Sequence, residues 1–420
     1  MTANESQSLR RRVESLRIRV ENLSSLRKLV DLPPDRDITK RQWAVLESQL
    51  KVVEARLLSR LKKAGRAYLP LVHDPRIART LNGLLGAIEL DMSRVYSFLD
   101  TYMDVLTQRH TPELGPLLSG CDVLAWDAIH RDHPALAIVE PPLVYCDRGF
   151  GASTLREGVM LPDHIPNPMP LIEIPYSRLK EKYNLTSVLH EAGHEAMVRL
   201  GLVSTLPKVF RSGLAKTGAS ATIQDFFALW SSEIGPDFWT FCSSGMAAAA
   251  GMREILALPP RHVFRVPGTD PHPPPYLRVL LSFEWCRQAW GRGAWDDWEK
   301  EWLDLYPLEG APIEARELLK RAGTYLPLIS RALFQTRFRV LNGKTIPDLF
   351  RLSTLAPSEL GRVAGTARSG TLDLKGISPS AQLAVFRLIR DQGKLPEEAI
   401  DGIMTEWLVK LGERRRHFLG

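Results

Sequence analysis

The most constraining feature of the sequence is a regular spacing of apolar side chains near its start. Leu9, Val13, Leu16, Val20 and Leu23 follow one another in alternating steps of four and three residues. On an α-helix this spacing places all five side chains on one face. An apolar helical face has to be covered by another element, so the spacing predicts packed helices at the start of the chain.

The same spacing recurs after a clear break. Pro33 and Pro34 end the first helix, because proline has no amide donor and disfavours helical geometry in the residue before it. Thr39, with Gln42 three residues later, matches a capping box at the start of a second helix. The second helix repeats the apolar spacing at Trp43, Leu46, Leu50, Val53 and Leu57. A helical hairpin is therefore predicted for residues 1–70.

The predicted hairpin also carries the positive charge of the protein. Residues 1–70 contain sixteen Lys/Arg and eight Asp/Glu, a net charge of +8, whereas the whole chain has a formal charge of +7. The other 350 residues therefore sum to −1. Any anionic partner, nucleic acid or a membrane surface, is expected to bind at residues 1–70, and solvated helix faces are the alternative.

Beyond residue 70 the apolar pattern divides the chain further. Residues 71–135 are predicted to be a helical linker or support region, with a long amphipathic helix over 76–108. Residues 136–300 are predicted to form a core with a small sheet, and residues 301–420 a helical C-terminal region. The short β-prone runs of the core lie at 137–139, 143–145 and 170–174. The predicted fold class is mainly α (α+β).

Composition argues against several classes of protein. No run approaches eighteen uncharged apolar residues, so a membrane-spanning helix is not expected. The Arg-rich start of the chain offers no apolar stretch for a secretory signal. The four cysteines form no CxxC pair, which argues against a disulfide-dense scaffold. We therefore expect a cytoplasmic protein.

One segment suggests chemistry: His190-Glu191-Ala192-Gly193-His194, within a helix predicted from about Leu185 to Leu200. The two histidines are one helical turn apart, so both rings project from one face and can bind a single Zn2+. Glu191 lies about 100° around the helix from His190. That position suits it to deprotonate a metal-bound water rather than to bind the ion. The alternative is a pair of buried, hydrogen-bonded histidines in a core helix.

A catalytic zinc site needs a third protein ligand. Glu233, 39 residues after His194, is the best candidate, and Asp237 is placed to accept the second ring N–H of a ligating histidine. Pro236 between them leaves a second possibility, in which a helix starts near Pro236 and Glu233 lies outside it. Weaker candidates for the third ligand are Asp225, Glu254 and His262.

These motifs together resemble a known family. His190-Glu191-x-x-His194 followed by Glu233-x-x-x-Asp237 is similar to the pattern of the gluzincin (thermolysin-like) zinc metallopeptidases. The resemblance implies that His190, His194 and Glu233 bind zinc. It also implies that Glu191 is the general base and that Asp237 holds a zinc-binding histidine.

A third element extends the resemblance, which covers about residues 170–278. Asp270-Pro271-His272, followed by an arginine, is similar to a His-Pro and arginine pair in some of these families. The resemblance implies that His272, Tyr276 or Arg278 stabilises the oxyanion of the tetrahedral intermediate, and the choice among the three stays open. The run 170–175 would be the edge strand on which such enzymes bind an extended peptide.

The predicted function is hydrolysis of peptide bonds by a zinc-activated water. The resemblance implies a zincin-like catalytic core within residues 136–300, and the substrate would be a protein or peptide. Two alternatives stay open. One is a zinc hydrolase of a non-peptide amide or ester, because metal-activated water does not dictate the acyl group. The other is a binding or scaffold protein whose zinc site is structural or vestigial.

Overall fold

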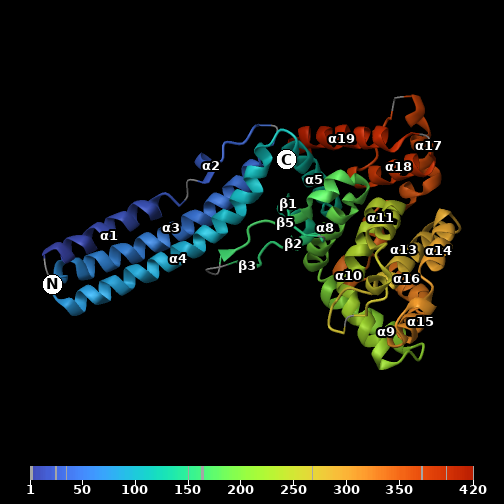
Figure 1. The fold of residues 1–420 in the computed structure, drawn as a ribbon, viewed down its shortest axis with the longest axis horizontal. Coiled ribbons are helices and arrows are strands. Elements are labelled where there is room, and N and C mark those ends of the chain that lie inside the picture. Colours follow the sequence, from blue (N-terminus) through green and yellow to red (C-terminus); the bar gives the residue numbers. More distant parts are fainter. Residues whose placement is uncertain are drawn as a thin grey trace. The chain divides into compact units, whose positions relative to one another are not determined.

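The protein is mainly helical and has one small three-stranded sheet (Figure 1), which confirms the prediction of a mainly α fold with a small sheet. The chain divides into two compact units. The first comprises Met1–Pro116, Leu155–Pro170 and Leu419–Gly420, and the second comprises Leu117–Thr154 and Leu171–Phe418. These boundaries do not coincide with those of the four predicted segments. The computed structural model describes residues 3–23, 26–34, 36–149, 151–161, 165–266, 268–369, 372–393 and 395–419.

Three long helices form most of the first unit: α1 (Ala3–Glu21), α3 (Lys40–Tyr68) and α4 (Pro75–Thr107). Both helices of the predicted hairpin are present, and α4 packs against each of them to make a three-helix bundle. The apolar side chains at the predicted spacing form its core, together with a stripe on α4. Buried members of this core are Leu16, Val20, Leu46, Leu50, Leu57, Leu81, Leu85 and Ile88. The shorter helices of this part are α2 (Leu26–Leu29), η1 (Leu69–Leu71) and η2 (Gln108–His110).

The start of α3 is fixed by its own side chains. The backbone N–H of Gln42 donates to Thr39 Oγ1 at 3.1 Å, and the backbone N–H of Thr39 donates to Gln42 Oε1 at 2.8 Å. The predicted capping box is therefore confirmed. Both bonds satisfy amide groups that a helix N-terminus would otherwise leave without partners, and such a cap is worth about 1 kcal/mol.

A segment of the chain outside the three helices also belongs to the first unit, residues 155–170. Its Asn167 side chain donates to the Leu155 carbonyl at 3.0 Å and accepts from the Tyr102 hydroxyl of α4 at 2.6 Å. These bonds, buried or partly buried, tie the segment to the bundle. The segment contains a short antiparallel pair, β3 (Met160–Leu161) and β4 (Ile165–Pro166).

The second unit is built around the long helix α10 (Ala221–Ser244), which contacts α8, α9, α11, α13 and α18. Most of its large aromatic side chains are buried, and the ring of Phe238 lies 5.4 Å from that of Trp285 on α13. Burial of a side chain such as Phe238 stabilises the fold by roughly 1.5–3 kcal/mol. The α-helices of this unit are α5 (Leu114–Ile129), α6 (Pro134–Ala137), α7 (Tyr176–Lys180), α8 (Thr186–Arg199), α9 (Leu202–Ala215), α11 (Met246–Leu256), α12 (Pro260–Val263), α13 (Pro275–Trp290), α14 (Ala294–Leu305), α15 (Ile313–Gly323), α16 (Leu326–Gln335), α17 (Pro357–Gly365), α18 (Pro379–Asp391), α19 (Glu397–Glu413) and α20 (Arg415–Leu419). Its 3-10 helices are η4 (Lys182–Leu185), η5 (Leu308–Gly310), η6 (Arg339–Leu341), η7 (Pro347–Leu349), η8 (Leu352–Leu355) and η9 (Thr366–Ser369).

The three-stranded sheet has the order β1-β5-β2, with β1 (Leu143–Asp147), β5 (Leu171–Pro175) and β2 (Ser153–Leu155). β1 and β5 are parallel, with Leu143 opposite Leu171. The prediction that the run 170–175 is an edge strand is wrong, because β5 is hydrogen-bonded to a strand on each side. A central strand has no unpaired backbone groups to offer a peptide. β2 is an edge strand instead.

The predicted β-prone run at 137–139 is not a strand. Residue 137 ends α6, which begins at Pro134. His133 caps this helix, because its Nδ1 accepts a hydrogen bond from the backbone N–H of Ala135 at 3.2 Å. A helix start with a cap and a proline at its first position outweighs the β propensity of Ile138 and Val139. Among the described residues, none of the helices is long and apolar enough to cross a membrane.

Candidate metal centre

Two histidines of α8 face the same space, as predicted from their spacing. Their rings stand nearly perpendicular, at 88°, with centroids 4.8 Å apart. His190 Nε2 lies 3.1 Å from His194 Nε2. This separation is compatible with two ring nitrogens bound to one ion at about 2.0–2.1 Å each.

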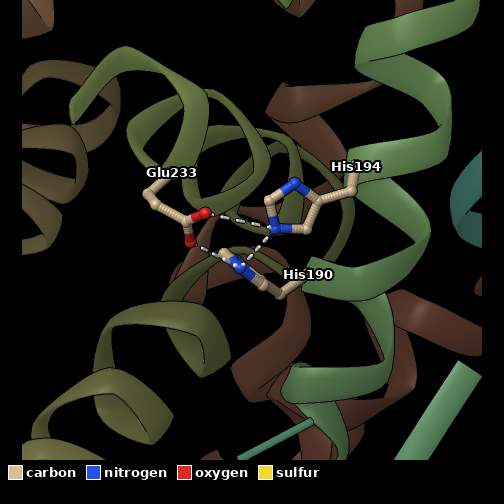
Figure 2. A group of neighbouring side chains, drawn as sticks. All are labelled: His190, His194 and Glu233. Atoms are coloured by element: carbon tan, nitrogen blue, oxygen red, sulfur yellow. Dashed lines mark hydrogen bonds and ion pairs between the residues drawn. The ribbon is translucent and has the colours of Figure 1, made fainter. Parts of the chain in front are cut away.

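Glu233 brings a carboxylate to the same point from α10 (Figure 2). Its Oε2 lies 3.3 Å from His190 Nε2, and its Oε1 lies 3.6 Å from His194 Nε2. The ligand atoms of the three residues all lie within 4.8 Å of one another. α10 continues without a break through Pro236, so the possibility that a helix starts near Pro236 and leaves Glu233 outside is wrong.

The close approach of α8 and α10 depends on Gly193 and Pro236. A Cβ added at Gly193 would lie 3.1 Å from Pro236 Cα and 3.2 Å from the Pro236 carbonyl oxygen. Both neighbouring atoms belong to the backbone, which cannot move aside as a flexible side chain can. The glycine inside the His-Glu-x-x-His motif therefore lets the helix with the histidines meet the helix with Glu233.

Asp237 lies one turn after Glu233 and faces the other side of the His190 ring. His190 Nδ1 is 2.8 Å from Asp237 Oδ1. The negative charge of this carboxylate favours a proton on Nδ1, which leaves the Nε2 lone pair facing Glu233 and His194. Arg278 fixes Asp237 in turn, since its Nε donates to Oδ2 at 2.5 Å and its Nη2 to Oδ1 at 2.7 Å.

The charges around the two rings favour a cation between them. Burial raises the pKa of Glu233, but His190, Arg278 and His194 together outweigh this and lower it to about 2. Burial lowers the pKa of His190, but Asp237 outweighs this and raises it to about 10. Burial lowers the pKa of His194 to about 4, so that ring is neutral and has a lone pair to donate. A positive charge is therefore stabilised at this point, and a metal ion supplies one.

A further sign of a ligand is one oxygen of Glu233. Its Oε2 is buried and accepts no hydrogen bond from any described residue. Ring or guanidinium nitrogens of His190, His272 and Arg278 stand around it at 3.3, 3.5 and 3.8 Å. A buried carboxylate oxygen without a donor is costly, and coordination of a cation removes that cost.

Glu191 is buried on α8 and does not belong to the ligand group. Its Oε2 accepts a hydrogen bond from the Thr154 hydroxyl of β2 at 2.7 Å. Burial raises the pKa of Glu191, while His190 and Thr154 act in the opposite direction. A carboxylate with a raised pKa is the better proton acceptor. Sequence reasoning missed Thr154, which belongs to no motif and meets Glu191 only through the sheet.

The three residues predicted to stabilise the oxyanion lie in different environments. His272 is 56% exposed, and its Nε2 is 3.5 Å from Glu233 Oε2. Its Nδ1 is 2.5 Å from Asp270 Oδ1, which fixes the orientation of the ring. Arg278 is partly buried, with its side chain 13% exposed, and is engaged with Asp237, as described. Tyr276 is buried against Phe264, with ring centroids 5.6 Å apart, and no described contact joins it to the ligand group.

The weaker candidates for the third ligand each have a partner of their own elsewhere in the second unit. These partners are Arg211 for Asp225, Arg387 for Glu254 and Arg261 for His262. Among the described residues, the group of His190, His194 and Glu233 is the one cluster of potential ligands close enough to share an ion.

The donor set of this cluster, two imidazoles and one carboxylate, fits zinc with one coordination position left open. Comparison of the chain with protein-family models, curated proteins and solved structures found no match. The resemblance to gluzincin metallopeptidases therefore stays a prediction.

Proposed function

We propose that this protein is a zinc-dependent peptidase whose metal ligands are His190, His194 and Glu233. One observation carries the proposal: ligand atoms from two helices converge, and one of them is a buried carboxylate oxygen without a donor among the described residues. Two imidazoles and one carboxylate are the ligands of zinc hydrolases that keep a position for water or substrate.

Zinc bound there would lower the pKa of a water molecule and polarise the carbonyl group of the substrate. Glu191 takes the proton of the attacking water on its carboxylate and passes it to the leaving amine. The Thr154 hydroxyl holds that carboxylate in place through its 2.7 Å hydrogen bond. No side chain of the protein forms a covalent bond with the substrate.

His272 is the residue best placed to stabilise the developing negative charge. It is exposed enough to meet a substrate, and its Nε2 faces Glu233. Asp270 holds the ring in place through Nδ1, so that Nε2 is presented to the developing charge. Arg278 acts indirectly. It holds Asp237 in place, and Asp237 in turn lies against His190.

The sheet supports a peptide as the substrate. β2 is an edge strand, and its Thr154 contacts the general base directly. An edge strand presents backbone donors and acceptors to which an extended peptide can add. The substrate chain would then run beside Glu191.

The experiment that tests the proposal compares wild-type protein with Glu191→Gln. Zinc content is measured by atomic absorption, and cleavage is measured on a mixture of synthetic peptides. We expect one zinc per chain in both proteins and a loss of cleavage of about 10²–10⁴-fold in the variant. Absence of zinc from the wild-type protein, or normal cleavage by the variant, would refute the proposal.

Glu195→Gln is the matched control. Glu195 is buried on the same helix, its Oε1 accepts from Arg199 Nε at 2.8 Å, and it does not belong to the ligand group. We expect it to retain cleavage and zinc. If the protein cleaves small amides or esters but no peptides, a non-peptide hydrolase would be the better assignment. Zinc with no hydrolysis of any kind would favour a structural site.

The proposal extends to location and partners. All four cysteines are buried free thiols, which fits a reducing compartment, and we propose the cytoplasm. A protein or peptide is the proposed partner of the metal centre. The basic residues 1–70 are proposed to bind an anionic partner.

A further inference from the structure

One end of the helical bundle is a candidate binding surface for the anionic partner. Figure 1 shows the N-terminus at the same end of the first unit as the turn between α3 and α4. Arg10 Nη2 donates to the Leu69 carbonyl at 3.3 Å, and Arg12 Nη1 donates to Asn82 Oδ1 at 2.5 Å. The start of α1, the end of α3 and the start of α4 therefore meet there. We call residues 3–13 and 60–84 the basic end of the bundle.

The basic end accounts for the net charge of the protein. It contains nine Lys/Arg and two Asp/Glu, a net charge of +7, which equals the formal charge of the whole chain. All other residues together are therefore neutral. A charge concentrated at one end of an elongated bundle creates a local positive potential that a uniform distribution would not.

Much of this charge is not compensated within the protein. Some cations of the basic end are paired, such as Arg12 with Glu89 on α4 and Arg60 with Asp91. Five others are exposed and have no ion-pair partner among the described residues. They are Arg11, Lys62, Lys63, Arg66 and Arg76. Exposed, unpaired cations are free to contact an external anion at little desolvation cost.

The same end also exposes aliphatic side chains. Leu71, in the turn between α3 and α4, is 56% exposed, and Leu84 on α4 is 39% exposed. Aliphatic groups among cations suit the boundary of a lipid bilayer, where apolar side chains enter the headgroup region and cations contact anionic headgroups. Nucleic acid would instead favour aromatic side chains on which bases stack, and Tyr68, the aromatic residue of this end, is only half-exposed.

We propose that the basic end of the bundle binds an anionic lipid surface. Leu71 enters the headgroup region, and Lys62, Lys63 and Arg66 of the last two turns of α3 contact the anionic headgroups. The attraction weakens as salt is added, because these charges are exposed and screened by ions. Nothing in this proposal depends on the metal centre.

The test uses the full chain and vesicles of phosphatidylcholine with or without phosphatidylserine, in a sedimentation assay at low and high salt. We expect the protein to bind only those vesicles that contain phosphatidylserine, and to bind them more weakly at high salt. The triple variant Lys62→Glu, Lys63→Glu, Arg66→Glu should bind at least about tenfold more weakly, since each cation near such a surface contributes roughly fivefold. Leu71→Asp should weaken binding at both salt concentrations.

The matched control reverses three exposed cations of the second unit that have no ion pair with described residues. It is Lys208→Glu, Lys216→Glu, Lys320→Glu, with the same change in net charge. We expect this control, and Glu191→Gln, to bind as wild type does. Circular dichroism verifies that every variant is folded.

Four results would overturn the proposal: equal binding to both kinds of vesicle, wild-type binding by the α3 variant, equal weakening in the Lys208 control, or tighter binding to single-stranded RNA than to vesicles. The last would assign the surface to nucleic acid. Glu191→Gln is expected to bind vesicles as the wild-type protein does. The vesicle assay can therefore be interpreted even if the peptidase proposal fails, and the peptidase assay can be interpreted even if the lipid proposal fails.

Discussion

Charged residues are arranged in opposite ways at the candidate metal centre and at the basic end of the bundle. At the centre, Asp237 is buried, and the partly buried Arg278 donates two hydrogen bonds to it. At the basic end, Lys62 and Lys63 are exposed and have no ion pair with a described residue. A buried charge without a partner is costly, so the centre fixes its geometry pair by pair.

This difference predicts how the two regions respond to change. A single substitution at the centre leaves a buried partner without its bond, so its effect should be large and specific to that position. A single substitution at the basic end removes one of many screened charges, so the effect should be small and should add up with others. Four changes in the second unit follow in order of decreasing effect, and the last two have a counterpart in the bundle.

His194→Ala should have the largest effect, because it removes one of the three proposed zinc ligands. We expect the purified variant to contain no zinc and to have no hydrolytic activity. Metal content by atomic absorption is the measurement. His262→Ala, which alters an exposed histidine of the same unit, is the control and should keep its zinc. Full zinc occupancy in His194→Ala would contradict the assignment of the ligand.

Thr154→Val should reduce activity without removing the metal. It deletes a hydroxyl that bonds Glu191 Oε2 at 2.7 Å and keeps the shape of the side chain. A hydrogen bond to a charged group is worth about 1.5–3 kcal/mol, which corresponds to a fall in kcat of roughly ten- to a hundredfold. Thr154→Ser restores the hydroxyl and should recover most of the activity. If the serine variant were as slow as the valine variant, Thr154 would have only a packing role.

Gly193→Ala should destabilise the second unit, because its Cβ would lie 3.1 Å from Pro236 Cα. We expect a loss of up to about 3 kcal/mol in the free energy of unfolding, and weaker zinc binding as α8 and α10 separate. Urea unfolding and a zinc competition assay measure the two effects.

Gly86→Ala on α4 is the counterpart in the bundle. Nothing lies within 4 Å of its added Cβ, so it should stabilise by about 0.5–1 kcal/mol. Equal effects at the two glycines would refute the tight helix contact.

The smallest effects concern pH and two glutamates. Burial raises the pKa of Glu254, but Arg387 and Arg390 outweigh this and lower it. A lowered folded-state pKa stabilises the protein above the unfolded pKa, near 4.3, and this stability is lost as the pH falls. Glu254→Gln should therefore remove roughly 1–2 kcal/mol at neutral pH and nothing in acid.

Glu89 of the bundle offers the comparison for this pH effect. Its pKa is also lowered, first by Arg12, but its side chain is 36% exposed. Glu89→Gln should therefore cost about 0–1 kcal/mol at neutral pH. Unfolding by urea at neutral and acidic pH checks both variants. A loss for Glu254→Gln that does not change with pH would mean that its ion pairs are not the cause.

The sequence predicted those parts of the site that depend on spacing along a helix. His194 follows His190 by four positions, and Asp237 follows Glu233 by four, so the helix itself decides which side chains share a face. The helix predicted over 76–108 was likewise found as α4, because its apolar stripe is long and regular. In both cases the determinant is local.

What the sequence did not predict depends on contacts between distant segments. β2 has three residues, too few to produce a recognisable alternation, and its position beside β5 makes Thr154 a neighbour of Glu191. The packing of Gly193 on Pro236 requires two helices to be placed against each other. The engagement of Arg278 with Asp237 is a tertiary choice of rotamer that spacing does not determine.

The membership of residues 155–170 in the bundle has a consequence for biosynthesis. The segment lies between β2 and β5 in the sequence, so the ribosome delivers most of α5 and all of β1, which belong to the second unit, before this segment of the first unit has been made. Neither unit can be completed in the order in which the chain emerges. Their folding steps must interleave, and a nascent chain that stalls before Asn167 carries a bundle still lacking its tie to Tyr102.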